Sequence, residues 1–326
     1  MVYDFITIGG VTRDISFFTN DGILLDNSHD LLRQKLLAFE HGAKIKVDKF
    51  YFTYGGGGAN AAVNFANFGF KTACLAAVGK DVNGSEIIKN LKQKKVATEL
   101  ITKLSGDSGF SFILIDQGER IIFTQRGVNS DLFITAPMEK VLARTKNIYL
   151  SSLSGKWLSN LKKIFTLAEM KKIAVAWNPS QSQYQVGLKK LAPFLEKTHV
   201  FAVNKDEAIE LAIMSSQKKL SPTFLQKEKN LLQIIKSFGP KIVLITAGNK
   251  GAFVYDGANF YYQGILPEKK HVDMTGVGDI FNSTFVAGLS LYKGDIKKAL
   301  YLAARNTASK ISHLGAQNGL LKFKKK

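Results

Sequence analysis

Cysteine, arginine and long apolar runs are all scarce in this chain. Cys74 is the only cysteine in 326 residues, so no disulfide can form within the chain, and we expect a reducing, cytoplasmic environment. No apolar run approaches the roughly 18–20 residues that a membrane-spanning helix requires. Residues 1–10 read as a strand and a turn, without the basic start and cleavage pattern of a secretory signal. We therefore expect a globular protein that has no membrane partner.

The scarcity of arginine limits what the strong positive charge can mean. Lysine and arginine number 45 against 26 acidic residues, a formal charge of +19 at pH 7. Such a charge is compatible with nucleic-acid binding, but arginine is the residue preferred for bidentate contacts to bases and phosphates. The arginines are Arg13, Arg33, Arg120, Arg126, Arg144 and Arg305. The lysines are dispersed apart from the tail 322–326, which we expect to be frayed, so a solvated basic surface is favoured over a nucleic-acid site.

Short apolar runs alternate with amphipathic segments along most of the chain. The predicted strands are Phe5–Gly9, Thr72–Val78, Asn147–Leu150, Ile173–Trp177, His199–Val203 and Ile242–Thr246. The predicted helices include Ser85–Lys94, Trp157–Met170, Lys205–Met214 and Lys227–Phe238. This alternation predicts βαβ units with a mostly parallel sheet, and continuously apolar strands are typical of a sheet covered on both faces. We predict a single α/β domain over residues 1–326.

Two regions interrupt the alternation. Residues 16–54 form an interposed stretch that ends in the β-prone segment Val47–Tyr54. Residues 108–126 contain two strand-like segments, Gly109–Ile115 and Arg120–Gln125. The sequence between these two segments is typical of a hairpin turn.

We interpret these regions as a small sheet that projects from the body. It would comprise about residues 11–54 and 108–127, with the hairpin turn at Asp116–Glu119, and would act as a lid through which two copies of the chain can pair. An ordinary edge hairpin is the alternative, and periodicity alone does not separate the two.

The strongest motif lies in the segment Val272–Leu289. A Gly-Val-Gly turn at 276–278 runs into a long helix of apolar and small residues. N–H groups at a helix start are unpaired and the helix dipole is positive there, so the turn predicts an anion site that glycine leaves open to a phosphate. Asp279, in the first turn, is placed to take a proton from an incoming hydroxyl as a general base. Alone, it could equally be a helix-start acid that stabilises the dipole.

A second motif, Gly55–Gly69, begins with four consecutive glycines and opens another helix. The glycines provide a hinge and room for a ligand, and the amide of Asn60 suits a polyol. Residues 56–61 also match the loose dinucleotide pattern G-x-G-x-x-A, with Asp81 about twenty residues further on. We consider that interpretation the minor one, because the glycines follow a β-prone aromatic segment and not the first strand.

These two segments, in this order, resemble the two signature motifs of the ribokinase (PfkB) family of carbohydrate kinases. The resemblance extends from Gly9 and Asp14 to Gly315–Gln317, and no G-x-x-x-x-G-K-[ST] sequence of a P-loop kinase occurs. It implies a ribokinase-like three-layer αβα sandwich with a mostly parallel central sheet and a small β-sheet lid. It also implies ATP and Mg²⁺ as cofactors, and a monovalent cation such as K⁺ remains open.

The resemblance also implies roles for individual residues. Asp279 matches the catalytic base, and Gly276, Val277 and Gly278 match the anion hole, although Val277 stands where the family commonly has alanine. The positions that match substrate-binding residues are Asp14, Gly56, Gly57 and Asn60. From its place at a strand end we add Asn178 to them, although that residue could merely shape a turn before Pro179.

The nucleotide side is assigned in the same way. Asn204 and Glu207 match an arrangement that positions phosphates and Mg²⁺, Glu207 through water, although Asn204 could equally cap the helix that follows. The other nucleotide positions that the resemblance implies are Thr246, Gly248, Lys250, Gly251 and, at the adenine, Asn306. Residues 246–251 could also be a simple turn. Asp273 and Thr275 resemble a monovalent-cation site.

The predicted function is transfer of the γ-phosphate of ATP to a hydroxyl of a small sugar. Within the same chemistry, the alternative acceptor is a nucleoside, and Arg120 and Arg126 could instead reach an anionic sugar or simply pair at the surface. Alternatives from other classes are a catalytically weak ligand-binding or regulatory protein, a nicotinamide-dependent oxidoreductase and a nucleic-acid binder.

Overall fold

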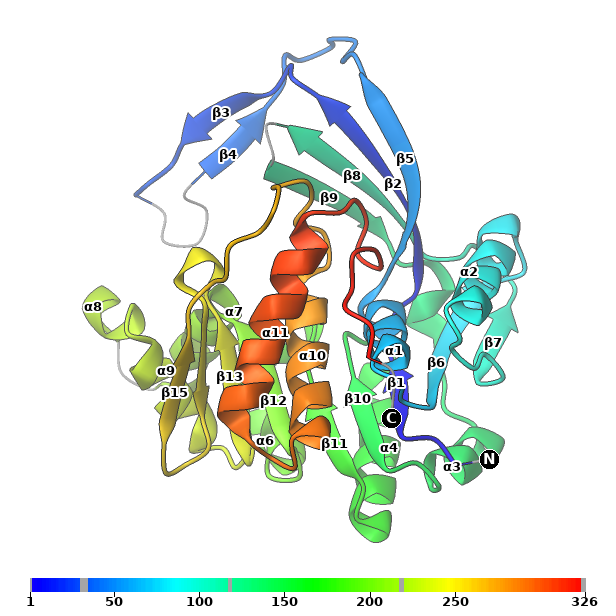
Figure 1. The fold of residues 1–326 in the computed structure, drawn as a ribbon, viewed down its shortest axis with the longest axis vertical. Helices are drawn as coiled ribbons and strands as arrows, with labels where there is room; N and C mark the ends of the chain where they lie inside the picture. Colours follow the sequence, from blue (N-terminus) through cyan, green and yellow to red (C-terminus); the bar gives the residue numbers. More distant parts are fainter. Residues whose placement is uncertain (1, 30–34, 117–118, 217–219, 324–326) are drawn as a thin grey trace.

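The computed structural model describes residues 2–29, 35–116, 119–216 and 220–323. Its main sheet has nine strands: β1 Phe5–Ile8, β6 Thr72–Gly79, β7 Ile101–Leu104, β10 Asn147–Leu150, β11 Ala174–Trp177, β12 Val200–Asn204, β13 Ile242–Thr246, β14 Ala252–Tyr255 and β15 Phe260–Gln263. Their spatial order is β15-β14-β13-β12-β11-β10-β1-β6-β7 (Figure 1). The pairs from β7 to β13 are parallel, while β14 and β15 are added antiparallel. The six strands predicted from apolar runs are confirmed within two residues.

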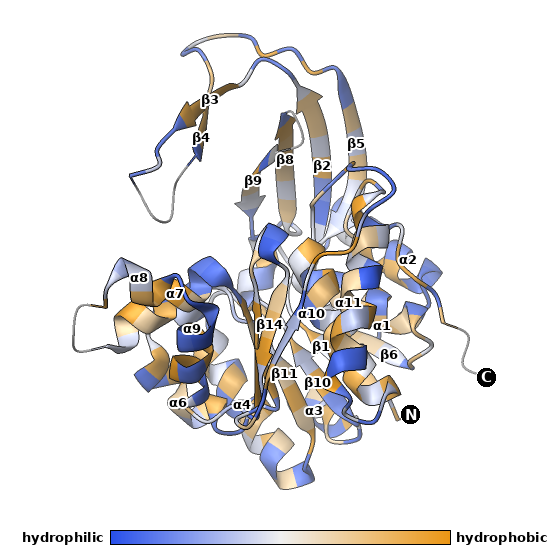
Figure 2. Ribbon diagram, turned by 60° about the vertical axis from the view of Figure 1, so that its left-hand side comes forward, coloured by the Kyte–Doolittle hydropathy of each residue, from blue (hydrophilic) through white to orange (hydrophobic). Residues whose placement is uncertain are grey.

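Helices cover both faces of this sheet. One face packs against α3 Ala136–Leu142, α4 Trp157–Lys171, α6 Leu188–Leu195, α7 Lys205–Ser215 and α9 Glu228–Lys236. The other packs against α1 Gly57–Asn67, α2 Val82–Gln93, α10 Val277–Leu291 and α11 Ile296–Ile311. Within β1, Ile6 and Ile8 lie in the first core and Phe5 in the second, as the two-residue period of a strand requires. The expected three-layer sandwich is confirmed, and Figure 2 shows its apolar strands β11 and β14 among helices of mixed polarity.

A second sheet projects from this body. It consists of β2 Thr12–Thr19, β5 Lys49–Gly55, β8 Phe110–Asp116 and β9 Glu119–Gln125, in the order β5-β2-β8-β9. A separate hairpin, β3 Ile23–Asp26 and β4 Lys35–Ala38, extends beyond it (Figure 1). These strands fall within the two segments predicted for the small sheet, but β2, β3 and β4 were not predicted as strands. The turn residues 117–118 and the tail residues 324–326 lie outside the described residues.

The order of the strands determines where a ligand can bind. The chain leaves β1 toward β6 on one side and later returns to β10 on the other side of β1. The carboxyl ends of β1 and β10 therefore lie at a point where the direction of winding reverses, and open α/β sheets bind ligands at such a point. The segments there are Gly9–Gly10 and Ser151–Ser152.

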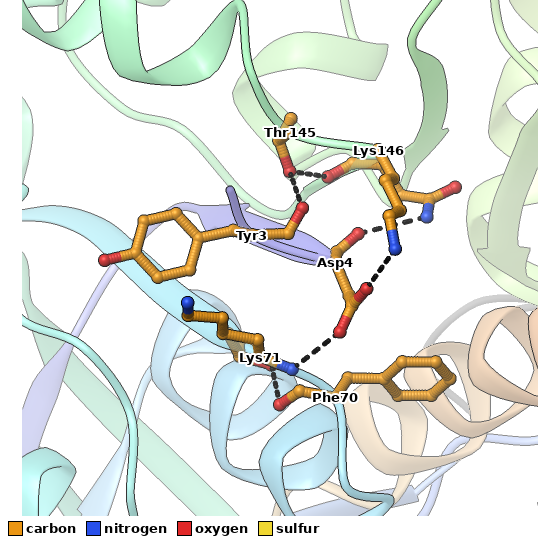
Figure 3. A network of polar contacts seen from close by, with 8 residues as sticks. Tyr3, Asp4, Phe70, Lys71, Thr145 and Lys146 are labelled. Atoms are coloured by element: carbon orange, nitrogen blue, oxygen red, sulfur yellow. Dashed lines mark hydrogen bonds and ion pairs between the residues drawn. The ribbon is translucent and has the colours of Figure 1, made fainter. Parts of the chain in front are cut away.

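At the opposite, amino ends of the parallel strands, polar contacts around Asp4 hold the central strands together (Figure 3). The carboxylate of Asp4 accepts the backbone N–H of Lys71 at 2.9 Å and the ammonium of Lys146 at 2.8 Å. Lys71 precedes β6 and Lys146 precedes β10, so one side chain fixes the amino ends of the three central strands.

No helix among the described residues is long and apolar enough to cross a bilayer.

Candidate active site

A polar cavity of about 210 Å³ lies at the reversal point of the main sheet. The body contributes Gly10, Gly56, Gly57, Asn60, Ser152, Thr275, Gly276 and Asp279 to its wall. The small sheet and the turn after it contribute Asp14, Ser111, Ile113, Ile122, Thr124 and Arg126. The two sequence motifs, more than two hundred residues apart, therefore meet at one cavity that the small sheet helps to close.

Asp279 lies in the first turn of α10 and is half-buried. Its Oδ2 accepts a hydrogen bond of 2.9 Å from Asn60 Nδ2. Burial raises the pKa of Asp279, against the opposing effects of the Asn60 hydrogen bond and the positive charge of Arg120. A carboxylate with a raised pKa that borders a cavity is a stronger base than an exposed aspartate.

The turn before Asp279 has the geometry of an anion site. Gly276 caps the helix with φ 71°, and a side chain there would collide with the methyl group of Ala316. Around Gly278, in contrast, no atom of the described residues lies within 4 Å of where a side chain would begin. No acceptor within the described parts of the chain takes the N–H groups of Gly276, Gly278 or Asp279. These N–H groups are therefore available to an anion.

Val277 departs from the expectation. Its N–H is donated to the carbonyl of Met274 at 3.3 Å, which closes a turn. The prediction that Val277 offers its amide to a phosphate is therefore wrong for this conformation, and the amides on either side of it remain.

Asn60 belongs to a chain of side-chain amides that ends at the carboxylate of Asp279. Asn90 Nδ2 donates to Gln317 Oε1 at 2.8 Å, and Gln317 Nε2 donates to Asn60 Oδ1 at 3.2 Å. Asn60 then donates to Asp279. Asn60 borders the cavity as expected and orients the carboxylate with one of its two N–H groups, while its contact with a polyol stays a prediction.

Gly57 brings the backbone of α1 close to the end of β10. A side chain at this position would overlap Ser151 Oγ and approach Asp279 Oδ1 at 3.2 Å. Only glycine leaves this approach unobstructed, which accounts for one member of the glycine run.

Asp14, on β2, places a second carboxylate in the same cavity. It is buried, and its Oδ1 has no hydrogen-bond partner among the described residues. Burial raises the pKa of Asp14, although hydrogen bonds from Thr12 and Ser111 oppose this. An unpaired buried oxygen at a cavity wall indicates a site for a ligand hydroxyl.

The predicted nucleotide residues lie along the neighbouring carboxyl ends of β12 and β13. Asn204 pairs in register with Thr246. Asn204 Oδ1 accepts the N–H of Glu207 at 2.9 Å, and Glu207 Oε2 accepts the N–H of Asn204 at 2.8 Å, so the two residues form a capping box for α7. Burial raises the pKa of Glu207 to about 7. The capping alternative is thus realised, and it does not exclude a ligand role because Asn204 is exposed.

Residues 246–251 form the turn between β13 and β14. Gly248 and Lys250 are exposed in a 3₁₀ turn, and nothing lies within 4 Å of where a Gly248 side chain would begin. Gly251 has φ 83° and would overlap the Gln263 carbonyl if it carried a side chain. The turn therefore offers exposed backbone beside Asn204.

Asn306 does not fit the predicted contact with adenine. It is fully buried in α11, where its Nδ2 donates to Asn64 Oδ1 at 2.9 Å and to Thr284 Oγ1 at 2.8 Å. Its Oδ1 accepts the N–H of Leu321 at 2.7 Å. The prediction is wrong because this amide is saturated inside the protein, where it joins α1, α10 and α11.

Asn178 also does not line the polar cavity next to Asp279. Its Nδ2 donates to the carbonyl of Ala202 at 2.8 Å and so bridges the ends of β11 and β12. The cavity wall does not include it, so the turn-shaping alternative describes it better than substrate binding.

Of the two predicted monovalent-cation residues, Asp273 contacts both Thr275 and a buried lysine, Lys310. Asp273 Oδ1 accepts the N–H of Thr275, and Asp273 Oδ2 accepts the N–H of Gly315, both at 2.7 Å. The ammonium of Lys310 donates to the carbonyl of Asp273 at 2.6 Å and lies 3.6 Å from its Oδ2. Burial opposes ionisation of Asp273, but the Lys310 charge and the two N–H groups outweigh it and lower the pKa of the carboxyl.

The dinucleotide interpretation does not survive in the structure. Gly56 follows β5 of the small sheet and not the first strand of the body. Asp81, which that interpretation assigns to a ribose, caps α2 through Gly84 and accepts two further hydrogen bonds from Ser108.

Several residues at the site were not identified from the sequence. Ser111, Thr124 and Ser152 belong to no motif, and Gln317 and Lys310 act through contacts distant in sequence. One pattern could have revealed Lys310. It follows Ala299, Ala303 and Asn306 at helical spacing on the buried stripe of α11, where a charged residue is unexpected.

Comparisons with known proteins agree with this fold. The chain is 29% identical to a ribokinase of Mus musculus over 77% of its length and 74% of that protein. It is 26% identical to a ribokinase of Lactococcus lactis over 91% of its length and 92% of the relative. The fold of Arabidopsis thaliana ribokinase, solved with ribose and ATP, matches with a TM-score of 0.77 at 17% identity over 99% and 96% of the two chains.

A Burkholderia thailandensis nucleoside kinase, solved with inosine, has the same fold, with a TM-score of 0.75 at 16% identity over 97% and 94% of the chains. The model of the pfkB family carbohydrate kinases matches residues 28–322. The chain therefore belongs to the pfkB family of carbohydrate kinases, which are phosphotransferases.

Proposed function

We propose that this chain transfers the γ-phosphate of ATP to a hydroxyl of a small sugar, with Asp279 as the general base. The observation that carries the proposal is the position of Asp279, which borders the acceptor cavity and directly follows the open amides of Gly276 and Gly278. The base and the anion site are thus joined in one helix start.

The polar side chains in the cavity wall indicate which groups would hold the acceptor. Asp14 Oδ1 has no partner within the described chain and would accept a sugar hydroxyl. The small sheet would act as a lid, since Ser111 and Thr124 come from its strands β8 and β9 while Asp279 comes from the body. Lid closure excludes water and favours transfer to the sugar over hydrolysis.

The nucleotide would lie from the Gly276–Gly278 turn toward the ends of β12 and β13. Its phosphates would approach Asn204, and its nucleoside the exposed turn 246–251. The proposed Mg²⁺ would bind largely through phosphate oxygens and water. Glu207 would hold the ion through water, and the bound ion would neutralise charge on the phosphates.

A sugar is favoured over a nucleoside by the composition of the cavity wall. Among the described residues that line it, none is aromatic, and the apolar side chains are Ile113 and Ile122. Bases bind proteins largely by stacking on aromatic rings, whereas hydroxyl-rich ligands use the carboxylate, amide and hydroxyl groups present here.

The proposal is tested with Asp279→Asn and an acceptor screen. ADP release is measured with pentoses, hexoses, sugar acids, sugar phosphates, adenosine and inosine, and we expect turnover with a sugar. For that sugar the variant should turn over about 10²–10⁴-fold more slowly, because the proton acceptor is lost, while it still binds ATP.

Asp131→Asn, at an exposed aspartate that does not line the cavity, is the matched control and should keep wild-type turnover. Turnover of Asp279→Asn equal to that of the control would refute the role of Asp279. Turnover with nucleosides alone would refute the sugar.

A further inference from the structure

Lys310 is a fully buried lysine that nothing in the transfer chemistry explains. It lies in the last turn of α11 with no exposed surface and is among the largest completely buried side chains of the described chain. A buried charge is costly unless it is paired and hydrogen-bonded, so its partners indicate what it does.

The contacts of the Lys310 ammonium are oxygens of Asp273. The backbone carbonyl accepts at 2.6 Å, and carboxylate Oδ2 lies at 3.6 Å. Carbonyl and carboxylate oxygens are the ligands that a hard metal cation would take. The ammonium therefore lies at the oxygens of Asp273, one of the two residues whose sequence resembles a monovalent-cation site.

Two hydrogen bonds connect Asp273 to the segments on either side of residues 276–278, the turn proposed to bind an anion and called here the anion turn. Asp273 Oδ1 holds the N–H of Thr275, the residue directly before Gly276. Asp273 Oδ2 holds the N–H of Gly315, and Ala316 packs against Gly276. The positive charge of Lys310 thus stabilises the carboxylate that fixes both sides of the anion turn.

An additional cation does not fit this arrangement. The carboxylate of Asp273 already has a buried counter-ion and a hydrogen bond on each oxygen, and a second cation at the same oxygens would face the like charge of Lys310. Thr275, the other predicted ligand, lines the cavity as a residue, and its hydroxyl is buried without a hydrogen-bond partner among the described residues.

We propose that Lys310 is a positioning residue whose tethered ammonium takes the place of a monovalent cation, so that the anion turn of this enzyme is held without K⁺. This inference rests on the proposed function for its catalytic consequence. The structural part, a built-in cation behind residues 273–276, concerns the folded protein itself.

The first experiment uses the unmodified chain. Its melting temperature and its rate of ADP release are measured in about 0.1 M KCl and in the same concentration of tetramethylammonium chloride, which matches ionic strength. We expect equal melting temperatures and rates that agree within about twofold. A saturable rise of either quantity with K⁺ would overturn the proposal, because it would show a cation site in addition to Lys310.

The second experiment removes the ammonium. Lys310→Ala leaves the carboxylate of Asp273 unpaired and opens space behind it, so the melting temperature should fall by about 5–10 °C in tetramethylammonium chloride. K⁺ or NH₄⁺ should restore part of this loss and part of the rate. Lys310→Met, which fills the space with an apolar chain, should be destabilised without rescue.

Lys297→Ala, on the exposed face of the same helix, is the matched control and should respond to neither salt. A folded Lys310→Ala variant that is indifferent to K⁺ would contradict the substitution of a cation by lysine. If Lys310→Ala does not fold, the wild-type salt comparison decides. Because melting needs no turnover, a failure of the sugar screen would count against the proposed function and not against this inference.

Discussion

At the scale of single residues, two glycines of the anion turn separate stability from activity. Gly276 has a positive φ and packs against Ala316, whereas Gly278 has helical geometry and borders open space. The same motif thus contains one glycine that the fold requires and one that, under the proposed function, leaves room for the phosphate. Their sequence context gives no hint of this difference.

Gly276→Ala and Gly278→Ala therefore form a matched pair. Gly276→Ala should lower the free energy of unfolding by about 1–3 kcal/mol, because the left-handed backbone and the Ala316 contact both resist a side chain. Gly278→Ala should leave it unchanged or raise it by up to about 1 kcal/mol, since alanine is favoured in a helix. Denaturant titration measures both values.

The effect on turnover should be the reverse for Gly278→Ala. Its new methyl group would occupy space beside an open amide, so kcat/KM for ATP should fall about tenfold or more through misplacement of the phosphate. A stable Gly278→Ala enzyme with wild-type kcat/KM would show that the phosphate binds elsewhere.

At the scale of helices and strands, burial determines what could be predicted from the sequence. Strands β1, β6 and β10 to β13 were found because both of their faces are covered and their sequences are continuously apolar. β2 was missed because its buried face carries Asp14 and Ser16, which are polar. Asp14 lines the cavity and Ser16 is buried on the same face, so these polar residues of β2 face inward and the apolar ones outward, the reverse of the pattern expected for a half-buried strand.

The candidate site, like the strands, could be predicted from the sequence only in part. The turn 276–279 and the glycines 55–58 could be predicted because backbone geometry and sequence motif coincide. The partners of Asn60 and Asp273 could not, because Gln317 and Lys310 reach them from the end of the chain through the packing of α11 and the segment after it. Sequence spacing carries no information about such contacts.

The contacts between helices also decide the role of Asn306. Its amide connects α11 to Asn64 of α1 and to Thr284 of α10, and neither contact involves a ligand. Asn306→Ala should lower the free energy of unfolding by at least about 1–3 kcal/mol, because buried polar partners lose their hydrogen bonds. The KM for ATP should stay within about twofold of wild type.

Thermal or denaturant unfolding and steady-state kinetics on the same preparations separate these two effects. Lys298→Ala, a change at an exposed pair on α11, provides a control for small changes in helix stability. A large rise in KM for ATP without loss of stability would restore the adenine contact that the structure argues against.

At the scale of the whole molecule, the cavity next to Asp279 lies between two sheets, one covered by helices on both faces and one with an exposed face. The nine-stranded sheet has helices on both faces (Figure 1), and Asp4 connects the amino ends of its three central strands (Figure 3). The four-stranded sheet, in contrast, has an exposed face that includes Phe50, Phe112 and Phe123. Segments with few buried contacts open at low free energy. The small sheet is therefore the part of the molecule expected to move, and its pairing with a second copy stays a prediction.

Closure of this sheet over the acceptor should be visible by amide hydrogen exchange. With the sugar and a non-hydrolysable ATP analogue bound together, exchange in β8 and β9 should slow about tenfold or more, because Ser111, Thr124 and Arg126 then contact the ligand. The hairpin β3–β4, whose four β3 residues are all exposed, should change little and serves as an internal control. Equal slowing in both segments would indicate general stabilisation, and no slowing in β8 and β9 would mean that the small sheet is a fixed wall and the acceptor enters without its movement.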